Sequence, residues 1–377
     1  LPIELPADSP TILALGGELK NTVALADGGN VFISQHLGDL STEETLRAFE
    51  RATVDLERLY DATPTRIACD LHPDYRSGGY ARRARLPLVR IQHHHAHVVS
   101  CMAENGVDGT VLGIAWDGAG YGTDGTIWGG EFLVATKSAF ERAGHFRTFS
   151  LPGGERAIRE PRRLAIGLLY EVFGEEVLER DDLIPVRSFS NVERAILRQM
   201  LTRGVNSPRT SSVGRLFDAV ASILGLRQTT TFEGQGAMAL EFALEEIEID
   251  EVYPFGLDDL KGGPQDRTPF SVDWEPLVHN LCDEVSQGVS RRKIAAKFHN
   301  TLIEIIASVA KRLGEEQVVL TGGCFQNKYL TERAVRRLEE EGYRPFRHRR
   351  VPSNDGGLCL GQAVIASERL LKAPQAI

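Results

Sequence analysis

Four histidines lie within residues 92–97, which read Gln-His-His-His-Ala-His. The apolar run before them predicts a short buried strand, and the residues after them predict a helix. Because positions i and i+4 of a helix share one face, His93 and His97 can point at the same metal ion. His94 and His95 would point away from that face, and we expect them in the core or behind the metal ligands.

Two aspartates are candidates for the remaining ligands. Asp117 follows a predicted strand over 111–116, and Asp355 stands directly before a Gly-Gly pair. Such positions are expected at the mouth of a cleft between lobes, and with His93 and His97 they would form a set suited to Fe²⁺, Mn²⁺ or Zn²⁺. In the alternative interpretation both aspartates only cap turns, and their spacing does not decide between the two.

Four Gly-rich turns follow predicted strands. Glycine allows backbone N–H groups to approach a phosphate, and a helix that begins there adds a favourable dipole. One such turn is ordinary, but four at strand ends favour a nucleotide, and the absence of GxxxxGK(S/T) excludes a P-loop. The candidate nucleotide-binding residues are Gly16, Gly17, Gly118, Gly120, Gly322, Gly323, Asn327 and Gly356.

The elements that must hold these residues form a pattern that occurs twice. Each half begins with strands and continues with mixed helices and strands, which predicts an α/β protein of two related lobes with a cleft between them. A Gly-rich turn is expected over 118–125, and a polar surface excursion over 250–273. The predicted strands and helices cover 11–15, 21–26, 31–35, 66–69, 86–91, 111–116, 126–134, 291–313 and 318–320, with a helical region over about 155–245.

The composition, with 42% apolar and 25% charged residues, is ordinary for a globular protein. No stretch approaches the roughly 20 apolar residues that span a bilayer, and neither a signal peptide nor a membrane partner is expected. The five cysteines are scattered without a CxxC pair, which favours the reducing cytoplasm over a disulfide-bonded or zinc-ribbon fold. The net charge of -9 disfavours broad nucleic-acid binding. The chain does not begin with Met, which leaves open that it is part of a longer protein.

Motifs lie at 92–97 and 117–132 and at five further places along the chain. Together they resemble the HypF family, the carbamoyltransferases of NiFe-hydrogenase maturation. The resemblance runs over nearly the whole chain, but it covers only the C-terminal half of that family's architecture. The family's upstream acylphosphatase-like module, zinc fingers and YrdC-like module have no counterpart here. The motifs that carry the resemblance lie at 14–21 (Ala-Leu-Gly-Gly-Glu-Leu-Lys-Asn), 70–75 (Asp-Leu-His-Pro-Asp-Tyr), 92–97, 117–132, 159–161 (Arg-Glu-Pro), 233–235 (Glu-Gly-Gln) and 322–327 (Gly-Gly-Cys-Phe-Gln-Asn).

The resemblance implies a duplicated actin-like ATPase fold (ASKHA, ribonuclease H-like), which TsaD and the O-carbamoyltransferases share. Residues 1–109 would form the N-terminal lobe, and residues 110–377 the C-terminal lobe with a helical insertion over about 155–290. The resemblance also implies that the Gly-rich turns bind ATP or carbamoyl-adenylate. A divalent metal is implied at the two-His, two-Asp set, Fe²⁺ in the first place and Zn²⁺ as the alternative, with Mg²⁺ as a further candidate ion.

The implied reaction is the transfer of a carbamoyl group. In the family the upstream module makes carbamoyl-adenylate from carbamoyl phosphate and ATP, and the actin-like part passes the carbamoyl group to the C-terminal cysteine thiol of HypE, which yields the cyanide ligands. Asp117 and Lys20 are the expected catalytic residues, Lys20 by neutralising charge near the phosphate or carbamoyl group. Because the acceptor supplies the thiol, Cys324 is expected to pack rather than to react.

Three other functions stay open. A carbamoyl-transfer enzyme of the same fold could act on tRNA or on a small hydroxyl compound, although the acidic balance disfavours tRNA. An actin-like small-molecule kinase is disfavoured by the histidines, because kinases hold Mg²⁺ largely through phosphates and carboxylates. A nucleotide-sensing module without enzymatic activity is the third, and binding of carbamoyl-adenylate without turnover would support it.

Overall fold

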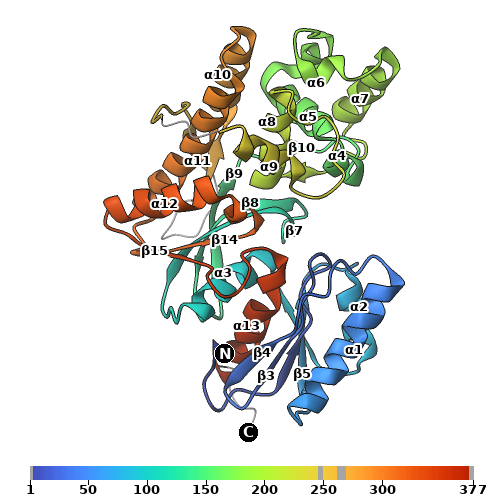
Figure 1. The fold of residues 1–377 in the computed structure, drawn as a ribbon, viewed down its shortest axis with the longest axis vertical. Helices are drawn as coiled ribbons and strands as arrows, with labels where there is room; N and C mark the ends of the chain where they lie inside the picture. The colour runs from blue at the N-terminus through green and yellow to red at the C-terminus, as the bar shows by residue number, and fades with distance from the viewer. Residues whose placement is uncertain (1–2, 245–248, 261–268, 373–377) are drawn as a thin grey trace.

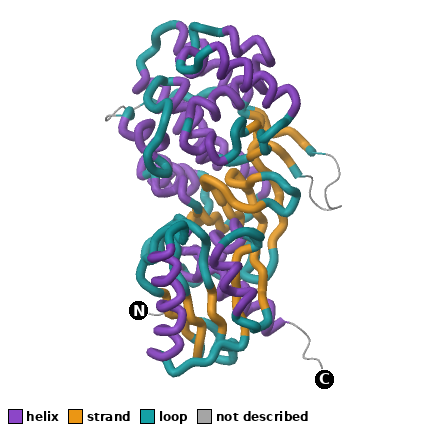
Figure 2. The backbone as a smooth tube through the Cα atoms, turned by 90° about the vertical axis from the view of Figure 1, so that its right-hand side faces the viewer, coloured by secondary structure: helices purple, strands orange, loops and turns teal. Residues whose placement is uncertain are grey.

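The computed structural model describes residues 3–244, 249–260 and 269–372 of the 377-residue chain. Figure 1 shows two lobes, one above the other, each built on a β-sheet. The first strands and the last helix of the chain both lie in the lower lobe. Helices fill the upper part of the molecule, whereas strands run through its middle and lower parts (Figure 2).

The first sheet has six strands in the order β1-β4-β3-β2-β5-β6. Strand β3 is antiparallel to both of its neighbours, β4 and β2, and β5 and β6 run parallel to β2. Its elements are β1 (Ile3–Glu4), β2 (Ile12–Ala14), β3 (Ala24–Asp27), β4 (Asn30–Ile33), α1 (Glu43–Leu59), β5 (Arg66–Asp70), α2 (Arg76–Arg83) and β6 (Leu88–Ile91).

The second sheet repeats this order in its central part. Strands β9, β8 and β7 are antiparallel, and β14 and β15 run parallel to β7, so β9-β8-β7-β14-β15 matches β4-β3-β2-β5-β6. The repeat confirms the predicted duplicated, actin-like α/β fold with two lobes. The central elements are β7 (Val111–Tyr121), β8 (Ile127–Ala135), β9 (Phe140–Phe146), α11 (Arg291–Leu313), β14 (Gln317–Thr321), α12 (Lys328–Glu340) and β15 (Arg344–Arg347).

The remaining elements of the second lobe are mostly helices. The sheet continues at one edge through β13 and β12, and β11 joins β8 to β10. In the described part of the chain, no helix combines the length and apolar character that a bilayer crossing requires. The elements are β10 (Phe149–Ser150), α4 (Glu155–Arg159), α5 (Pro161–Phe173), α6 (Ile184–Arg187), α7 (Asn191–Arg203), β11 (Arg209–Thr210), α8 (Val213–Ile223), α9 (Gln235–Phe242), β12 (Gly256–Asp259), β13 (Phe270–Asp273) and α10 (Glu275–Ser286), with a 3-10 turn at Gly174–Glu179.

The prediction of a surface excursion over 250–273 is wrong for the part of this segment that the structure describes. Strands β12 and β13 pair there and extend the second sheet beyond β9. The reason is a short alternation in which Phe270 and Val272 are buried on either side of Ser271, and a partner strand far away in the sequence completes the pairing. Residues 261–268 of this segment lie outside the described residues.

Two helices pack between the sheets and bring them together. Helix α13 (Leu358–Lys372) lies on the first sheet, α3 (His93–Glu104) lies on β7, β8 and β14, and the two helices pack against each other. Gly361 makes this approach close, because a Cβ there would stand 1.8 Å from the carbonyl oxygen of Ala96. Helix α3 is therefore buried on all sides from its first turn, which explains why its histidines are inaccessible to water.

The strands of the first sheet are buried on both faces by different helices. Leu13, Leu25 and Ile67 pack with α1, whereas their neighbours Ile12 and Ala24 pack in the cluster that contains α13. This alternation has the period of two that a strand imposes. Although α13 lies beyond residue 110 in the sequence, it thus completes the core of the first lobe.

Candidate metal and nucleotide site

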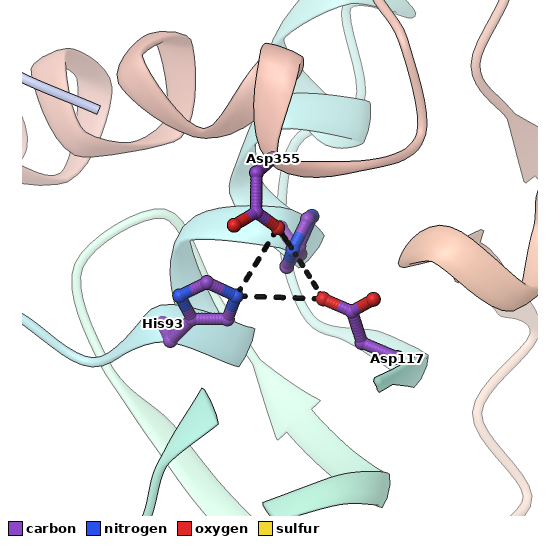
Figure 3. Close-up of side chains that lie close together, drawn as sticks. His93, Asp117 and Asp355 are labelled. Carbon is purple, nitrogen blue, oxygen red and sulfur yellow. Dashed lines mark hydrogen bonds and ion pairs between the residues drawn. The ribbon is translucent and has the colours of Figure 1, made fainter. Parts of the chain in front are cut away.

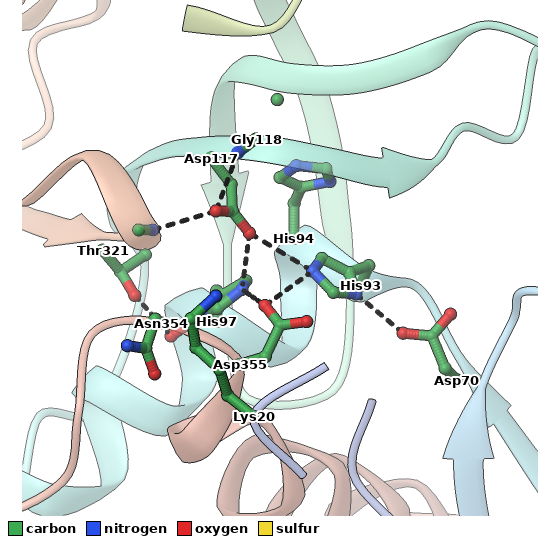
Figure 4. Close-up of polar contacts among 12 residues, drawn as sticks. Lys20, Asp70, His93, His94, His97, Asp117, Gly118, Thr321, Asn354 and Asp355 are labelled. Atoms are coloured by element: carbon green, nitrogen blue, oxygen red, sulfur yellow. Dashed lines mark hydrogen bonds and ion pairs between the residues drawn. The ribbon is translucent and has the colours of Figure 1, made fainter. Parts of the chain in front are cut away.

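The first turn of α3 carries the two histidines that the helical spacing singles out. Gln92 caps this helix, and its side-chain oxygen accepts a hydrogen bond from the backbone N–H of His95 at 2.9 Å. The rings of His93 and His97 are 0% and 1% exposed and face the same side of the helix (Figure 4). The helix therefore fixes two imidazoles at the junction of the two sheets.

Asp117 reaches the same point from an irregularity in β7. The sequence predicted a strand that ends at residue 116 and a turn over 118–125. Instead, the strand runs on to Tyr121 and pairs again with β8. A register shift between Trp116 and Gly120 separates the two paired stretches and releases Asp117 from the ladder. The N–H groups of Gly118 and Gly323 donate to Asp117 Oδ1 at 2.8 and 3.1 Å, which leaves Oδ2 to face the histidines.

Asp355 completes the group from a 3-10 turn, Asp355–Gly357, directly before α13. Its Oδ1 lies 3.5 Å from His93 Nε2 and 3.4 Å from His97 Nε2, and Asp117 Oδ2 lies 3.5 and 3.2 Å from the same two atoms (Figure 3). Ligands about 2.0–2.2 Å from a central ion at tetrahedral angles lie about 3.3–3.6 Å apart. The spacing of these atoms therefore fits one cation between them.

The orientation of the His97 ring also fits a shared cation rather than direct pairing, whereas His93 Nε2 makes one long contact of 3.5 Å with Asp117 Oδ2. His97 Nε2 is buried and makes no hydrogen bond of acceptable geometry, although two carboxylate oxygens lie within 3.4 Å of it. Two imidazoles and two carboxylates are a donor set that Fe²⁺ and Zn²⁺ both accept. The four residues predicted as metal ligands are thus brought together, with all ligand atoms within 4.8 Å of one another.

The charge balance of the group favours a positive centre. Burial opposes the charged form of Asp117, but the rings of His93 and His97 outweigh it and hold the pKa of this carboxyl well below its usual range. Burial likewise opposes ionisation of Asp355, yet the histidines lower its pKa to about 2. Burial also opposes protonation of His93, but the negative charges of Asp355 and Asp70 raise its pKa well above the usual value. Two ionised carboxylates thus favour positive charge here, and a bound metal ion would take the place of the proton that they favour on His93.

Asp70 supports the site by contacting the His93 nitrogen that faces away from the other carboxylates. Its functional position was not recognised from the sequence. It ends β5, and its Oδ2 lies 2.8 Å from His93 Nδ1. A carboxylate on the second nitrogen fixes the tautomer and the direction of a metal-binding imidazole. The available signal was an aspartate at a strand end, as for Asp117.

His94 and His95 point away from the ligand face, as predicted. His95 Nε2 donates to the carbonyl oxygen of Thr136 at 2.8 Å, and burial lowers the pKa of His95 to about 4. Burial lowers the pKa of His94 well below its usual value. Gly120 faces these rings, since a Cβ there would stand 2.5 Å from His94 Cε1. Gly120 therefore makes room for the histidine helix rather than for a nucleotide.

A cavity of about 200 Å³ opens beside Asp117 and lies between the second sheet and the helical part of the second lobe. Of the residues predicted to bind nucleotide, Gly118, Gly323 and Asn327 line it. Asn327 also caps α12 by accepting from the N–H of Leu330 at 2.8 Å. We call this space the nucleotide-side cavity.

The other predicted glycines lie elsewhere. The N–H of Gly16 donates to Gln362 of α13 at 2.8 Å, and a Cβ on Gly17 would stand 3.1 Å from Asp355 Oδ2. Gly322 stands against the carbonyl of Trp116, where a Cβ would approach to 2.2 Å. Gly356 lines a different cavity, described below. Gly16 and Gly322 allow backbone segments to approach one another, and Gly17 leaves room for the side chain of Asp355.

Arg215 and Asp218 line the nucleotide-side cavity from α8. Arg215 Nη1 lies 3.2 Å from Asp218 Oδ2, and both side chains are nearly fully buried. Burial raises the pKa of Asp218 to about 6. A Cβ on Gly118 would stand 2.9 Å from Arg215 Nη2, so the guanidinium lies close to the Asp117 segment.

Lys20 crosses from the first lobe to the second. It stands in the loop after β2 with a φ of 47°, which is uncommon for a residue other than glycine. Its ammonium group pairs with Glu233, which precedes α9. Burial opposes the charge, but Glu233 raises the pKa of Lys20, so the group is a cation at neutral pH. Cys324 lines the same cavity, and burial raises the pKa of its thiol, as expected of a packing residue.

Comparisons with known families place this chain among carbamoyltransferases. Residues 113–362 match the model of the second subdomain of the carbamoyltransferase Kae1-like domain, and residues 7–104 match the HypF Kae1-like domain. HypF of Synechocystis sp. is 43% identical over an alignment of 376 residues, which covers 96% of this chain and 48% of the relative. HypF of Rhizobium leguminosarum is 38% identical over 98% of this chain and 47% of the relative. This chain belongs to the HypF carbamoyltransferase family.

The chain spans about half the length of these curated relatives. A HypF homolog of Cupriavidus necator differs, since it is 37% identical and its match covers 94% of its own length. Among solved structures, full-length HypF in a phosphate- and nucleotide-bound form has a TM-score of 0.90 at 37% identity, over 99% of this chain and 57% of that one. HypF of T. kodakarensis has a TM-score of 0.85 at 31% identity, over 98% of this chain and 49% of that one.

Proposed function

We propose that this chain transfers the carbamoyl group of carbamoyl-adenylate to the C-terminal cysteine thiol of HypE, as a step in making the cyanide ligands of NiFe-hydrogenase. The observation that carries the proposal is a group of four side chains whose ligand atoms are spaced to hold one cation, directly beside the nucleotide-side cavity. Asp117 belongs to both the group and the cavity wall. A reaction at an adenylate requires both features in one place, because the leaving group and the reacting carbonyl are adjacent atoms of one molecule.

In this proposal a divalent metal, Fe²⁺ or alternatively Zn²⁺, is held by His93, His97, Asp117 and Asp355. When bound, such an ion acts as a Lewis acid that polarises a carbonyl or phosphoryl oxygen. Asp70 keeps His93 oriented, and the N–H groups of Gly118 and Gly323 keep Asp117 oriented. Mg²⁺ remains a candidate companion of the nucleotide phosphates.

The nucleotide part of the donor occupies the nucleotide-side cavity. The nucleotide-bound state of a solved relative supports ATP or an adenylate as the ligand of this fold. The cationic groups of Arg215 and Lys20 compensate the phosphate charge, and Glu233 holds Lys20 at the cavity wall. Glycine at 118 and 323 keeps this wall free of side chains beside Asp117.

The acceptor sulfur attacks the carbamoyl carbon as a thiolate. A C–S bond forms, the C–O bond to the phosphate breaks, AMP leaves with its electron pair, and the thiol proton passes to solvent. Lys20 is protonated and is not the base, so its role is to stabilise negative charge on the leaving group. The chain itself needs no nucleophile, in agreement with the buried thiol of Cys324.

The decisive experiment is complementation in trans. A full-length HypF relative whose own metal-binding histidines are changed to alanine supplies carbamoyl-adenylate from carbamoyl phosphate and ATP. Addition of this chain is expected to restore a carbamoyl adduct on the cysteine of HypE, detected by intact-mass spectrometry. His93→Ala of this chain is the control and is expected to restore nothing.

Two outcomes would contradict the proposal. One is an unmodified HypE although the chain binds ADP and metal, which would support a nucleotide-sensing module instead. The other is carbamoyl phosphate-dependent release of AMP or pyrophosphate by the chain alone. We expect these 377 residues by themselves to bind ATP or ADP without that release, because they correspond to only about half the length of the curated relatives.

A further inference from the structure

A second, larger cavity reaches the site from the side of the first lobe. It has a volume of about 740 Å³ and is lined by β4, by the residues that follow it, by Tyr60 after α1, and by the loop 350–356. We call this space the β4 groove. Its inner end is formed by Lys20, Thr22, Asn354 and Gly356, so it ends next to Asp355.

The β4 groove and the nucleotide-side cavity share two lining residues, Lys20 and Asn354. Both side chains are attached to the second lobe, Lys20 by its ion pair with Glu233 and Asn354 by a hydrogen bond from Nδ2 to Gln326 Oε1 at 2.9 Å. The two spaces therefore meet at a thin partition of two polar side chains. Figure 4 shows both residues beside the metal-ligand group.

The sizes of the two spaces assign them different ligands. The nucleotide-side cavity, at about 200 Å³, has no room for a polypeptide in addition to a nucleotide. The β4 groove, at about 740 Å³, can hold several residues of a peptide. A second substrate therefore has its own way to the site, from the opposite side.

The lining of the β4 groove fits an extended peptide with an anionic end. Phe32 stacks on Tyr60 at a ring distance of 3.7 Å, and together with Ile33 they give the groove an apolar wall. Lys20, His36 and Arg350 also line it, and none of the described lining residues is acidic. The chain as a whole has a net charge of -9, so the lack of acidic residues among the described lining residues sets the groove apart from the rest of the molecule. This difference favours a negatively charged ligand.

We propose that the β4 groove receives the carboxy-terminal tail of the acceptor protein as an extended peptide. The inference rests on the proposed function, in which the last residue of the acceptor carries the reacting thiol. Because the α-carboxylate belongs to that same residue, it reaches the Lys20 end of the groove together with the sulfur. The thiol thus approaches from the first lobe and the adenylate from the second.

The test is a photo-crosslinking map with the full chain. The probe is a synthetic decapeptide with the last ten residues of the acceptor, serine in place of the terminal cysteine, and benzoylphenylalanine four residues before it. Cross-links are expected within 31–36, at Tyr60 or within 350–354, with at least tenfold weaker labelling by the C-terminally amidated peptide. Cross-links within the helices of 155–244, or equal labelling by the amidated peptide, would overturn the proposal.

Charge-reversed variants provide the second measurement. His36→Glu and Arg350→Glu are expected to weaken peptide binding at least tenfold in fluorescence anisotropy, whereas Arg51→Glu on the outer face of α1 is the matched control and is expected to change it less than twofold. The ratio of carbamoyl transfer to the tail peptide with its cysteine over transfer to N-acetylcysteine is expected to fall by the same factor. An unchanged ratio would refute the groove while leaving the proposed function intact. Transfer to neither thiol by the unaltered chain would refute the function, and the cross-linking map would still decide on the groove.

Discussion

The two sheets share one strand order, but they contribute to the site in different ways. Strands β2 and β7 occupy equivalent places in their sheets. β7 supplies the proposed ligand Asp117 itself through its register shift, whereas β2 passes into Gly16 and Gly17, and the missing side chain of Gly17 lets Asp355 come close. The sheet that contributes a ligand is thus the irregular one.

The second pair of equivalent strands shows the same division. β5 ends at Asp70, whose carboxylate holds the ring of His93, and β14 ends at Thr321, whose hydroxyl donates to the carbonyl oxygen of His97 at 3.1 Å. One strand thus orients a ligand ring, and the other supports only the backbone of the ligand helix. Equivalent strand ends of the two sheets thus lie around α3 in the same arrangement, but they carry side chains of different chemistry.

Removal of the ligand from the second sheet is expected to have the largest effect. Asp117→Ala takes away one of four ligand side chains, and we expect more than about 100-fold weaker metal binding, since even loss of a supporting group costs about 10–100-fold. Metal content by mass spectrometry and carbamoyl transfer would both be measured. Asp108→Ala, an exposed carboxylate before the same strand, is the control, and equal metal content in the two variants would contradict the assignment.

Removal of the support from the first sheet is expected to have the next largest effect. Asp70→Asn keeps the shape of the side chain but removes the charge that fixes His93, and we expect about 10–100-fold weaker metal binding with the fold intact. Competition with a chelator gives the affinity, and circular dichroism checks the fold. An affinity equal to that of the unaltered chain would mean that the first sheet gives His93 no support.

In the second lobe, one buried histidine is expected to make the stability of the fold depend on pH. His299 of α11 is buried beside Asn327, its Nε2 lies 2.9 Å from Asn327 Nδ2, and burial lowers its pKa to about 4. Because the unfolded chain binds a proton near pH 6.5 and the folded chain does not, stability is lost as the pH falls below 6.5. Between pH 7.5 and 5.5 this residue is expected to account for about 1.4 kcal/mol of the loss.

Urea unfolding at these two pH values measures that effect. His299→Gln is expected to reduce the loss of stability on acidification by this amount, while other buried histidines such as His95 keep their own share. If the variant and the unaltered chain lose the same stability between the two pH values, His299 is not held neutral by the fold.

The smallest effect is expected for the counterpart of Asp70 in the second sheet. Thr321→Val removes one hydroxyl that donates to the His97 carbonyl, and a single neutral hydrogen bond contributes about 0.5–1.5 kcal/mol. We therefore expect metal affinity to change by less than about tenfold. A loss as large as that of Asp70→Asn would mean that the two strands support the ligand helix equally.

Much of the fold could be predicted because its signals are local. Apolar alternation predicted the three strands of the first meander and the first two strands of the second, whereas β9 was missed. The helical spacing of the histidines predicted that His93 and His97 share one face of a helix. Strands β12 and β13 and the continuation of β7 were missed, because their pairing partners lie far away in the sequence and glycine-rich or polar segments also fit turns.

The site shows the same limit. Residue type and position singled out the four candidate ligands, but their spacing left open that the two aspartates only cap turns, and the resemblance to HypF implied the full set. The contacts that support these residues were not predicted. The Arg215–Asp218 pair and the Lys20–Glu233 pair join residues whose types are ordinary on a surface, and only the fold buries or positions them. For the glycines, the sequence indicated close approach but not which atoms approach, and several of them face protein rather than a nucleotide.

The central claim is that one cation lies between His93, His97, Asp117 and Asp355. The most direct test is anomalous diffraction from crystals of this chain, with data collected on both sides of the iron and zinc absorption edges. We expect a single anomalous peak within about 2.0–2.3 Å of all four ligand atoms, beside the nucleotide-side cavity. A chain purified and soaked with Fe²⁺ or Zn²⁺ that shows no peak there, or shows the metal bound elsewhere, would contradict the account.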